Sequence, residues 1–280
     1  MTRALVLGGG GVAGIGWELG VLQGLADAGI DLTTADRLVG TSAGAAVAAQ
    51  ITSGFPLSSL FDRQLSADLL STELAADFDP DELMREFGTL LADTAPGAEL
   101  FRAMGAYALR ARTVPQSVRR PVIERRLPSH EWPARDLRLV AIDAMAGTPR
   151  VFTSADEVEL VDAVAASCAV PGVWPPVTIG DSRYIDGGVR SGTNLDVAEG
   201  CDVVVVIVPM PELPFAAPDA VSGAEVVRAS SRVVTISASE YSLSEMGANP
   251  LDPASAKPAA IAGRAQAAAH ADEVRAAWGS

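Results

Sequence analysis

Apolar runs and helical periodicity alternate along the N-terminal part of the chain. Residues 4–7 and 37–39 are short apolar runs of the kind found in buried strands. Apolar residues at helical spacing follow each run, over residues 14–28 and 43–51. This alternation is typical of an α/β fold whose central sheet is largely parallel.

The middle of the chain has a different pattern. From about residue 55 to residue 133 the segments are mostly helical and are separated by prolines, which predicts a helical insertion or cap. Strand patterns return at residues 137–145 and 149–154, around a hairpin-like "AGT", and "VVVVIVP" at residues 203–209 suits a buried parallel strand. Further helices are expected over residues 160–167, 223–237 and 261–278.

Together these patterns predict a three-layer α/β/α sandwich with a mostly parallel central sheet. We expect one domain over residues 1–280, with the helical insertion at about 55–133 and a C-terminal helical part at about 216–280. A chain of 280 residues with 49% hydrophobic and only 20% charged residues is able to fill one large core.

Charge and cysteine usage narrow the choice of partners and location. A net charge of -14 argues against nucleic acid as a partner and against strong attraction to an anionic membrane. The start of the chain lacks the pattern of a secretory signal, and no apolar run has the length of a transmembrane helix, so we expect a cytoplasmic protein. Cys168 and Cys201 have no metal-ligand spacing and are expected to be buried thiols. No metal or cofactor is predicted.

Four consecutive glycines separate the first predicted strand from the first predicted helix. Among them and beyond, Gly9, Gly11 and Gly14 satisfy the G-x-G-x-x-G pattern of dinucleotide-binding folds. Such a fold also needs an acidic residue at the end of the second strand, but Asp31 and Asp36 both precede that strand. The nucleotide-binding hypothesis therefore lacks its second contact with the ligand. We keep a nucleotide-binding module as the alternative function.

The second predicted strand runs into "GTSAG", which matches the G-x-S-x-G pattern of a nucleophile elbow. Gly40 and Gly44 would allow the tight turn that exposes Ser42, and the following helix N-terminus would stabilise negative charge. The structural alternative is a small-residue turn that lets the strand and helix approach closely.

An acyl-transfer serine also needs backbone N–H donors about 3 Å from the oxyanion that forms during the reaction. Glycines let the main chain come that close because they have no Cβ. We therefore predict that the loop of Gly9, Gly10 and Gly11 forms an oxyanion hole. The alternative, a tight turn for helix packing, accounts for one or two glycines but not for four.

The same serine needs a base, and the chain offers few candidates. His130 and His270 are the only histidines, the first in the polar loop "PSHEWP" and the second in an alanine-rich terminal helix. Neither position is typical of a catalytic histidine, so a carboxylate is the remaining choice of base. In "YIDGGV", Asp186 follows a short apolar run, and Gly187 and Gly188 would free the backbone to direct the carboxylate at a neighbour. By itself, Asp-Gly-Gly is also a common hairpin turn.

Several of these motifs occur together in one order. The glycine loop, "GTSAG", the hairpin "LRLVAIDAMAGTPRVFTS", "AVAASCAVPGVWPPV" and "YIDGGV" cover about the first 210 residues. In this combination the sequence resembles the patatin-like phospholipases. The resemblance implies a Ser–Asp dyad with Ser42 as nucleophile and Asp186 as proton acceptor, a glycine-loop oxyanion hole, and a phospholipid or other acyl-ester lipid as substrate.

One position departs from the family pattern. Patatin-like proteins usually have Arg or Lys within the glycine loop, and Ala13 stands in that place here. A second alternative follows, a lipid-binding protein of the same fold that has lost turnover.

The predicted insertion is rich in arginine. Between Arg102 and Arg138 lie nine arginines and three acids, which gives this segment a charge of +6. An apolar stripe at helical spacing lies beside them at Leu100, Phe101 and Met104. The segment suits either a lid that transiently contacts lipid phosphates at a membrane surface or a core-packed helix with a solvated basic face.

Overall fold

The computed structural model describes residues 1–66, 68, 73–211 and 216–279. Its centre is an eight-stranded sheet with the order β5-β6-β3-β2-β1-β7-β8, and β4 pairs with β3. The strands are β1 (Arg3–Leu7), β2 (Arg37–Thr41), β3 (Asp136–Asp143), β4 (Thr148–Phe152), β5 (Val177–Ile179), β6 (Ser182–Asp186), β7 (Val203–Val208) and β8 (Arg232–Ser237).

The sheet is parallel in its centre and antiparallel at one side. β3, β2, β1, β7 and β8 are parallel neighbours, whereas β4 and β6 both pair with β3 in the antiparallel sense. The hairpin predicted around "AGT" is therefore confirmed as β3 and β4. The apolar run of β7 is buried and lies between two parallel neighbours, as predicted.

One predicted element is wrong in part. Helical periodicity was expected over residues 223–237, but α9 (Pro218–Ser230) ends before a strand, β8, that occupies the rest of this segment. In β8 the alternate residues Val234 and Ile236 are buried, and the strand pairs in register with β7 at the edge of the sheet. Pairing with β7 decided the structure of a segment whose own pattern was ambiguous.

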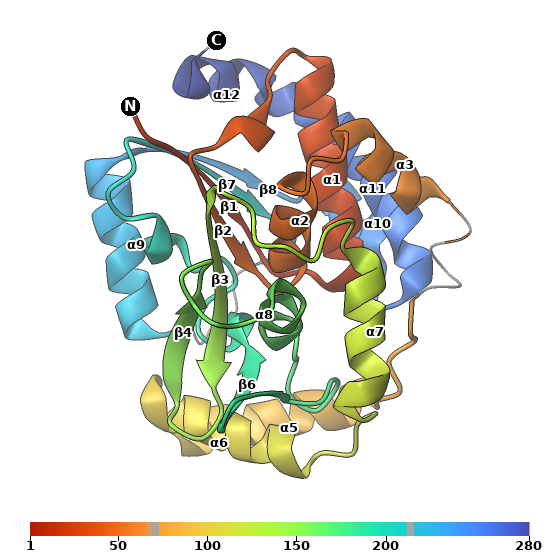
Figure 1. Cartoon of the computed structure of the whole chain (residues 1–280), viewed down its shortest axis with the longest axis vertical. Coiled ribbons are helices and arrows are strands. Elements are labelled where there is room, and N and C mark those ends of the chain that lie inside the picture. The colour runs from red at the N-terminus through yellow and green to blue at the C-terminus, as the bar shows by residue number, and fades with distance from the viewer. Residues whose placement is uncertain (67, 69–72, 212–215, 280) are drawn as a thin grey trace.

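Helices cover both faces of the sheet, so the predicted three-layer α/β/α arrangement is confirmed (Figure 1). α9 covers one face, and α1, α2, α8 and α11 cover the other. The remaining helices are α3, α5, α6, α7, α10 and α12. Their bounds are α1 (Gly11–Asp27), α2 (Ala43–Ile51), α3 (Leu57–Leu65), α5 (Pro80–Asp93), α6 (Ala98–Arg110), α7 (Gln116–Arg126), α8 (Leu160–Ser167), α10 (Glu240–Met246), α11 (Ala256–Ala267) and α12 (Ala271–Trp278).

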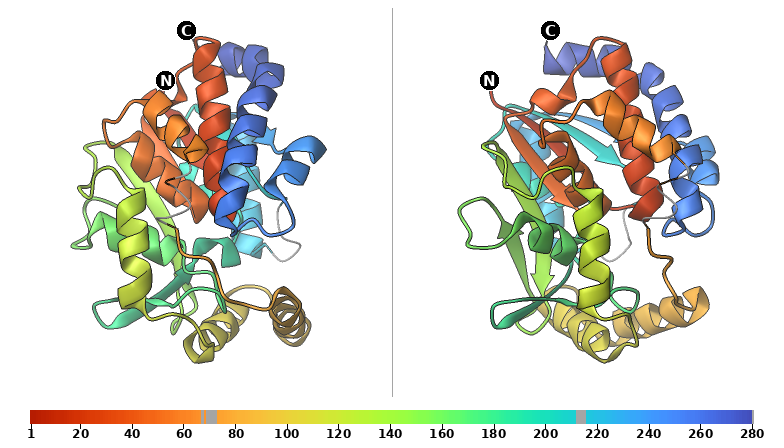
Figure 2. Two further views of the ribbon diagram at one scale, coloured as in Figure 1. Left: turned by 90° about the vertical axis from the view of Figure 1, so that its right-hand side faces the viewer. Right: turned by 45° about the vertical axis from the view of Figure 1, so that its right-hand side comes forward.

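Four of these helices, α3, α5, α6 and α7, lie in the segment predicted as a helical insertion. α5 and α6 lie across the base of the molecule, and α7 rises from there toward the middle of the sheet (Figure 2). The apolar stripe of α6 is buried: Leu100, Phe101 and Met104 pack with Ile142 of β3 and Ile185 of β6. The stripe is thus part of a core cluster, which agrees with the interpretation of this segment as a core-packed helix.

An extensive contact between two helices joins the N-terminal and C-terminal parts of the chain. α1 and α11 run side by side in both views of Figure 2. Glycines bring their backbones together: a Cβ on Gly20 would lie 2.1 Å from the carbonyl oxygen of Ala260, and one on Gly16 would lie 2.4 Å from that of Ala256. Because α1 begins at the glycine loop, α11 fixes the helix that carries this loop.

We expect Gly20→Ala to destabilise the fold by roughly 1–3 kcal/mol, because the added methyl group overlaps the backbone of α11 and forces the two helices apart. The matched control is Gly88→Ala in α5, where a Cβ meets nothing within 4 Å. That change removes backbone entropy from the unfolded chain and should be stabilising by about 0.5–1 kcal/mol. Thermal unfolding followed by circular dichroism measures both, and equal melting temperatures for the two variants would contradict the close contact.

Candidate active site

Ser42 lies on a strained turn between β2 and α2. Its backbone has φ 54 and ψ -115, a left-handed φ that residues other than glycine rarely adopt. The flanking glycines are required by close contacts: a Cβ on Gly40 would lie 2.6 Å from the Cα of Ala45, and one on Gly44 would lie 2.1 Å from the Leu7 carbonyl oxygen. This is the geometry expected of a nucleophile elbow.

The register of β3 brings Ser42 and Asp186 together. β2 pairs with β3 until Thr41 reaches Val140, and β6 takes over the same edge of β3, where Asp186 pairs with Ala141. Residue 42, which follows the last paired residue of β2, therefore meets the last residue of β6. The Ser42 hydroxyl interacts with the Asp186 carboxyl closely enough to lower the pKa of that carboxyl.

The residues after α8 hold the elbow in place. The Ser42 N–H donates to the hydroxyl of Ser167 at 3.0 Å, and this hydroxyl donates to the carbonyl of Val140 at 2.6 Å. The Cys168 thiol donates to the Ser42 carbonyl at 3.1 Å. Burial raises the pKa of this thiol to about 12, so Cys168 stays a neutral donor beside the elbow. Both cysteines are buried, as predicted.

Asp186 is a buried carboxyl whose two oxygens have different surroundings. Oδ1 accepts the Gly188 N–H at 2.7 Å, whereas Oδ2 has no hydrogen-bond partner of ordinary geometry. Burial raises the pKa of Asp186 to about 7, against the Gly188 N–H and the Ser42 hydroxyl, which both lower it. Gly187 has no space for a side chain, since a Cβ there would lie 2.3 Å from the Val140 carbonyl oxygen.

The glycine loop lies against the elbow. A Cβ on Gly9 would lie 3.5 Å from the Cβ of Ser42, and one on Gly14 would lie 3.1 Å from the Cβ of Ala43. The Gly9 N–H already donates to the carbonyl of Gly192 at 2.8 Å. The Gly9 N–H therefore has a backbone acceptor in this structure, and its place in an oxyanion hole stays a prediction.

The next two N–H groups of the loop differ from that of Gly9. Within the described residues, the N–H groups of Gly10 and Gly11 have no backbone acceptor. They lie at the N-terminus of α1, where N–H groups lack partners within the helix and favour a negative charge.

Protein atoms fill the space on the other side of the loop. A Cβ on Gly10 would lie 2.7 Å from the Cβ of Pro209, and one on Gly11 would lie 2.6 Å from the Pro250 carbonyl oxygen. That carbonyl accepts the Ala13 N–H at 3.0 Å, and Ala13 is completely buried. Pro209 and Pro250 thus leave no room for side chains at these two glycines.

Both histidines lie outside this site. His130 is half-exposed in its loop, where its Nε2 is 3.0 Å from the carbonyl oxygen of Glu124. His270 ends a short turn after α11, beside Gln266. Among the described residues that line the cavity at Ser42, none is a histidine.

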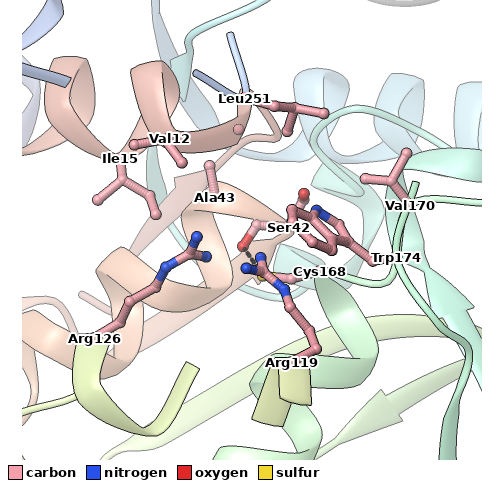
Figure 3. Close-up of a pocket in the computed structure, with 11 residues that line it drawn as sticks. Val12, Ile15, Ser42, Ala43, Arg119, Arg126, Cys168, Val170, Trp174 and Leu251 are labelled. Atoms are coloured by element: carbon pink, nitrogen blue, oxygen red, sulfur yellow. Dashed lines mark hydrogen bonds between the residues drawn. The ribbon is translucent and has the colours of Figure 1, made fainter. Parts of the chain in front are cut away.

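A small cavity adjoins Ser42 (Figure 3). Its volume is about 20 Å³, which is room for about one water molecule. Val12, Ile15 and Leu251 form its apolar side, and the side chains of Arg119 and Arg126 enter it from α7. An acyl chain needs more space than this, so a substrate of that size requires some of these side chains to move.

Sequence reasoning did not single out the residues of α7 and of the C-terminal segment that line the cavity. Arg119, Arg126 and Trp174 were visible only as members of a basic segment and of a family motif. The spacing of seven between the two arginines, two helical turns, is the one signal that could have placed them on the same face. Leu251 had no signal, because it lies far from the other site residues in sequence.

Two further observations concern ligands and membranes. The described part of the chain contains no group of three or more His, Cys, Asp or Glu residues able to hold a metal ion. None of the helices in the described ranges is both long and apolar enough to cross a membrane.

Comparison with known proteins defines the class and the family. Residues 5–199 match the model of the patatin-like phospholipases. The chain therefore belongs to the patatin-like phospholipase family, whose members are typically serine lipid hydrolases. No curated protein matches the chain.

Two solved structures are similar to the whole chain. VipD from Legionella pneumophila has 14% sequence identity and a TM-score of 0.46, with 96% of this chain and 67% of VipD covered. The type III effector protein ExoU has 16% identity and a TM-score of 0.45, with 97% of this chain and 53% of ExoU covered. The chain thus spans about half the length of ExoU.

We expect Asp186→Asn to stabilise the fold above neutral pH. The pKa of Asp186 in the folded state, about 7, exceeds the ordinary value of 3.8 that it has in the unfolded chain. The unfolded chain therefore releases this proton at lower pH, and the folded state loses stability as the pH rises from about 4 to about 7. An amide does not ionise and avoids this loss, which amounts to roughly 2–4 kcal/mol above pH 7 at about 1.4 kcal/mol per pKa unit.

The measurement is the difference in unfolding free energy between Asp186→Asn and the unchanged protein at several pH values. Glu18 is also a completely buried carboxyl with a raised pKa, but it is present in both proteins and cancels in the difference. A difference that does not change between pH 4 and pH 8 would contradict the assigned cause.

Proposed function

We propose that this protein is a lipid acyl hydrolase in which Ser42 and Asp186 form the catalytic dyad. The observation that carries the proposal is the contact between an elbow serine and a buried carboxyl with one unpartnered oxygen. Membership of the patatin-like family supports the same chemistry and indicates a phospholipid or other acyl-ester lipid as substrate.

In the first step, Ser42 Oγ attacks the acyl carbonyl carbon while the hydroxyl proton passes to Oδ2 of Asp186. The C=O bond becomes a C–O⁻ bond, and the free N–H groups of Gly10 and Gly11 stabilise the oxyanion. The tetrahedral intermediate then collapses, the ester C–O bond breaks, and the leaving alcohol takes the proton from Asp186. The acyl group remains on Ser42 as an ester.

In the second step, a water molecule attacks this acyl-enzyme and gives its proton to Asp186. Collapse of the second oxyanion breaks the bond to Ser42 Oγ, which takes the proton back. The product is a free fatty acid. No other acid or base is required, and Asp186 returns to its starting state.

Burial makes this carboxylate suited to the task. An ordinary carboxylate is too weak a base at neutral pH, whereas the raised pKa of Asp186, about 7, is close to the value at which a general base works best. The contact of Oδ1 with the Gly188 N–H leaves Oδ2 as the oxygen that accepts the proton. The nucleotide-binding alternative has less support, because the second strand, β2, does not end in an acidic residue that would bind the ribose.

We expect Ser42→Ala and Asp186→Asn each to lower hydrolysis of a short p-nitrophenyl ester by about three orders of magnitude or more, as loss of a nucleophile or base does in comparable enzymes. A fluorophosphonate should label the unchanged protein and not Ser42→Ala. A lipid-binding protein without turnover would give neither hydrolysis nor labelling, and quenching of tryptophan fluorescence by NADPH or FAD would instead support the nucleotide-binding alternative.

The matched control is the double variant His130→Gln/His270→Gln. Both histidines lie outside the cavity, so the variant should keep most of the activity of the unchanged protein. If it is folded by circular dichroism and inactive, the Ser42–Asp186 assignment is wrong.

The pH dependence of kcat/KM gives an independent check. The base must be deprotonated to accept the serine proton, so the rate should rise with pH and reach half of its maximum near pH 7, the pKa of Asp186. An unperturbed histidine titrates close to this range, so the profile is compared with that of the double histidine variant. The same midpoint in both proteins supports Asp186, and loss of the rise in the variant contradicts it.

A further inference from the structure

Arg119 is a buried cation that forms no salt bridge within the described residues. Its side chain lines the cavity at Ser42 and only 5% of its surface is exposed. Its Nε and Nη1 have no hydrogen-bond partner, and no carboxylate in the described ranges lies within salt-bridge distance. A buried charge of this kind is costly unless something compensates for it.

The neighbouring arginines of α7 are paired. Arg126, two turns further on, binds both oxygens of Glu73 at 2.7 and 2.6 Å. Arg120, on another face of the helix, binds Asp162 and Glu159. Since Glu73 is occupied by Arg126, the group of Arg119, Arg126 and Glu73 has one uncompensated positive charge.

Trp174 fixes the position of this charge. The guanidinium carbon of Arg119 lies 3.7 Å from the centre of the Trp174 ring, a stacked cation–π contact. Figure 3 shows both side chains beside Ser42, with the guanidinium end of Arg119 directed toward it. Burial and the charge of Arg126 lower the pKa of Arg119 to about 9, and the group is still a cation at neutral pH. Stacking on Trp174 fixes the plane of the Arg119 guanidinium but does not use its N–H groups, which point outward from the edge of that plane.

We propose that Arg119, stacked on Trp174, binds an anionic group of the substrate next to the ester bond that Ser42 attacks. This inference rests on the proposed function and adds a specificity-determining residue to it. A guanidinium suits the planar oxygens of a carboxylate or a phosphate. The anion comes either from the phosphate of a glycerophospholipid or from a carboxylate on the acyl side. Both would neutralise the charge that α7 brings into the cavity.

Two pairs of soluble esters test the proposal and distinguish the sources of the anion. Dihexanoylphosphatidylcholine is compared with neutral dihexanoylglycerol, and mono-p-nitrophenyl glutarate with neutral p-nitrophenyl valerate. For at least one pair, Arg119→Met should lower the ratio of kcat/KM for the charged ester to kcat/KM for the neutral ester by tenfold or more. Methionine keeps an apolar chain against Trp174, and Arg119→Lys, which keeps the charge, should recover part of the ratio.

The control is Arg112→Met, because Arg112 is an exposed arginine outside the cavity. Its ratios should stay within twofold of those of the unchanged protein. A fall in the phosphate pair alone identifies a phospholipid headgroup, and a fall in the glutarate pair alone identifies an acyl-side carboxylate.

Equal losses on the charged and neutral members of both pairs would overturn the proposal and leave Arg119 with a packing role. If Arg119→Met does not fold, inhibition of the unchanged protein decides: glycerol 3-phosphate or glutarate should compete with p-nitrophenyl valerate, and no competition by either overturns the proposal. An unchanged protein that hydrolyses none of the four esters contradicts the proposed function itself.

Discussion

The register along one edge of β3 is the constraint on which the site depends. β2 occupies this edge up to Val140, and β6 occupies it from Ala141 onward in the opposite direction. One strand therefore ends in Ser42 where the other ends in Asp186. A shift of one residue in either strand would turn its side chains to the other face and separate the two groups. The hydroxyl of Ser167 and the close approach of Gly187, both at the Val140 carbonyl, fix this point.

The site concentrates groups that oppose stability. Ser42 has a strained backbone, Asp186 is a carboxyl whose burial disfavours its charge, and Arg119 is a buried cation with no carboxylate partner. Each of them costs free energy in the folded state. A packed core on both faces of the sheet holds them in place, since most of β1, β2 and β7 is completely buried. The raised pKa of Asp186 is a direct product of this arrangement, because the same exclusion of water that destabilises the charge makes the carboxylate a stronger base.

Local patterns were sufficient for the fold class and for the residues of the elbow and the glycine loop, because both motifs follow strands with an apolar signal. The Asp-Gly-Gly turn follows only a short apolar run in β6, and its role came from the family resemblance. Local patterns failed where a distant part of the chain decides the outcome. β8 is a strand because β7 offers it an edge. Arg119 carries no signal in the sequence that separates it from the paired Arg120, since burial and pairing arise only from the packing of α7.

The C-terminal part of the chain belongs to the site although the family match ends at residue 199. α11 packs against α1 through backbone contacts at Gly16 and Gly20, and so positions the helix that begins at the glycine loop. The Pro250 carbonyl accepts the Ala13 N–H in the first turn of α1, and Leu251 closes the cavity over Ser42. Pro250 thus accepts the N–H of Ala13, whereas the N–H groups of Gly10 and Gly11 stay available. The segment after residue 199 thus helps to set which donors a bound oxyanion would meet.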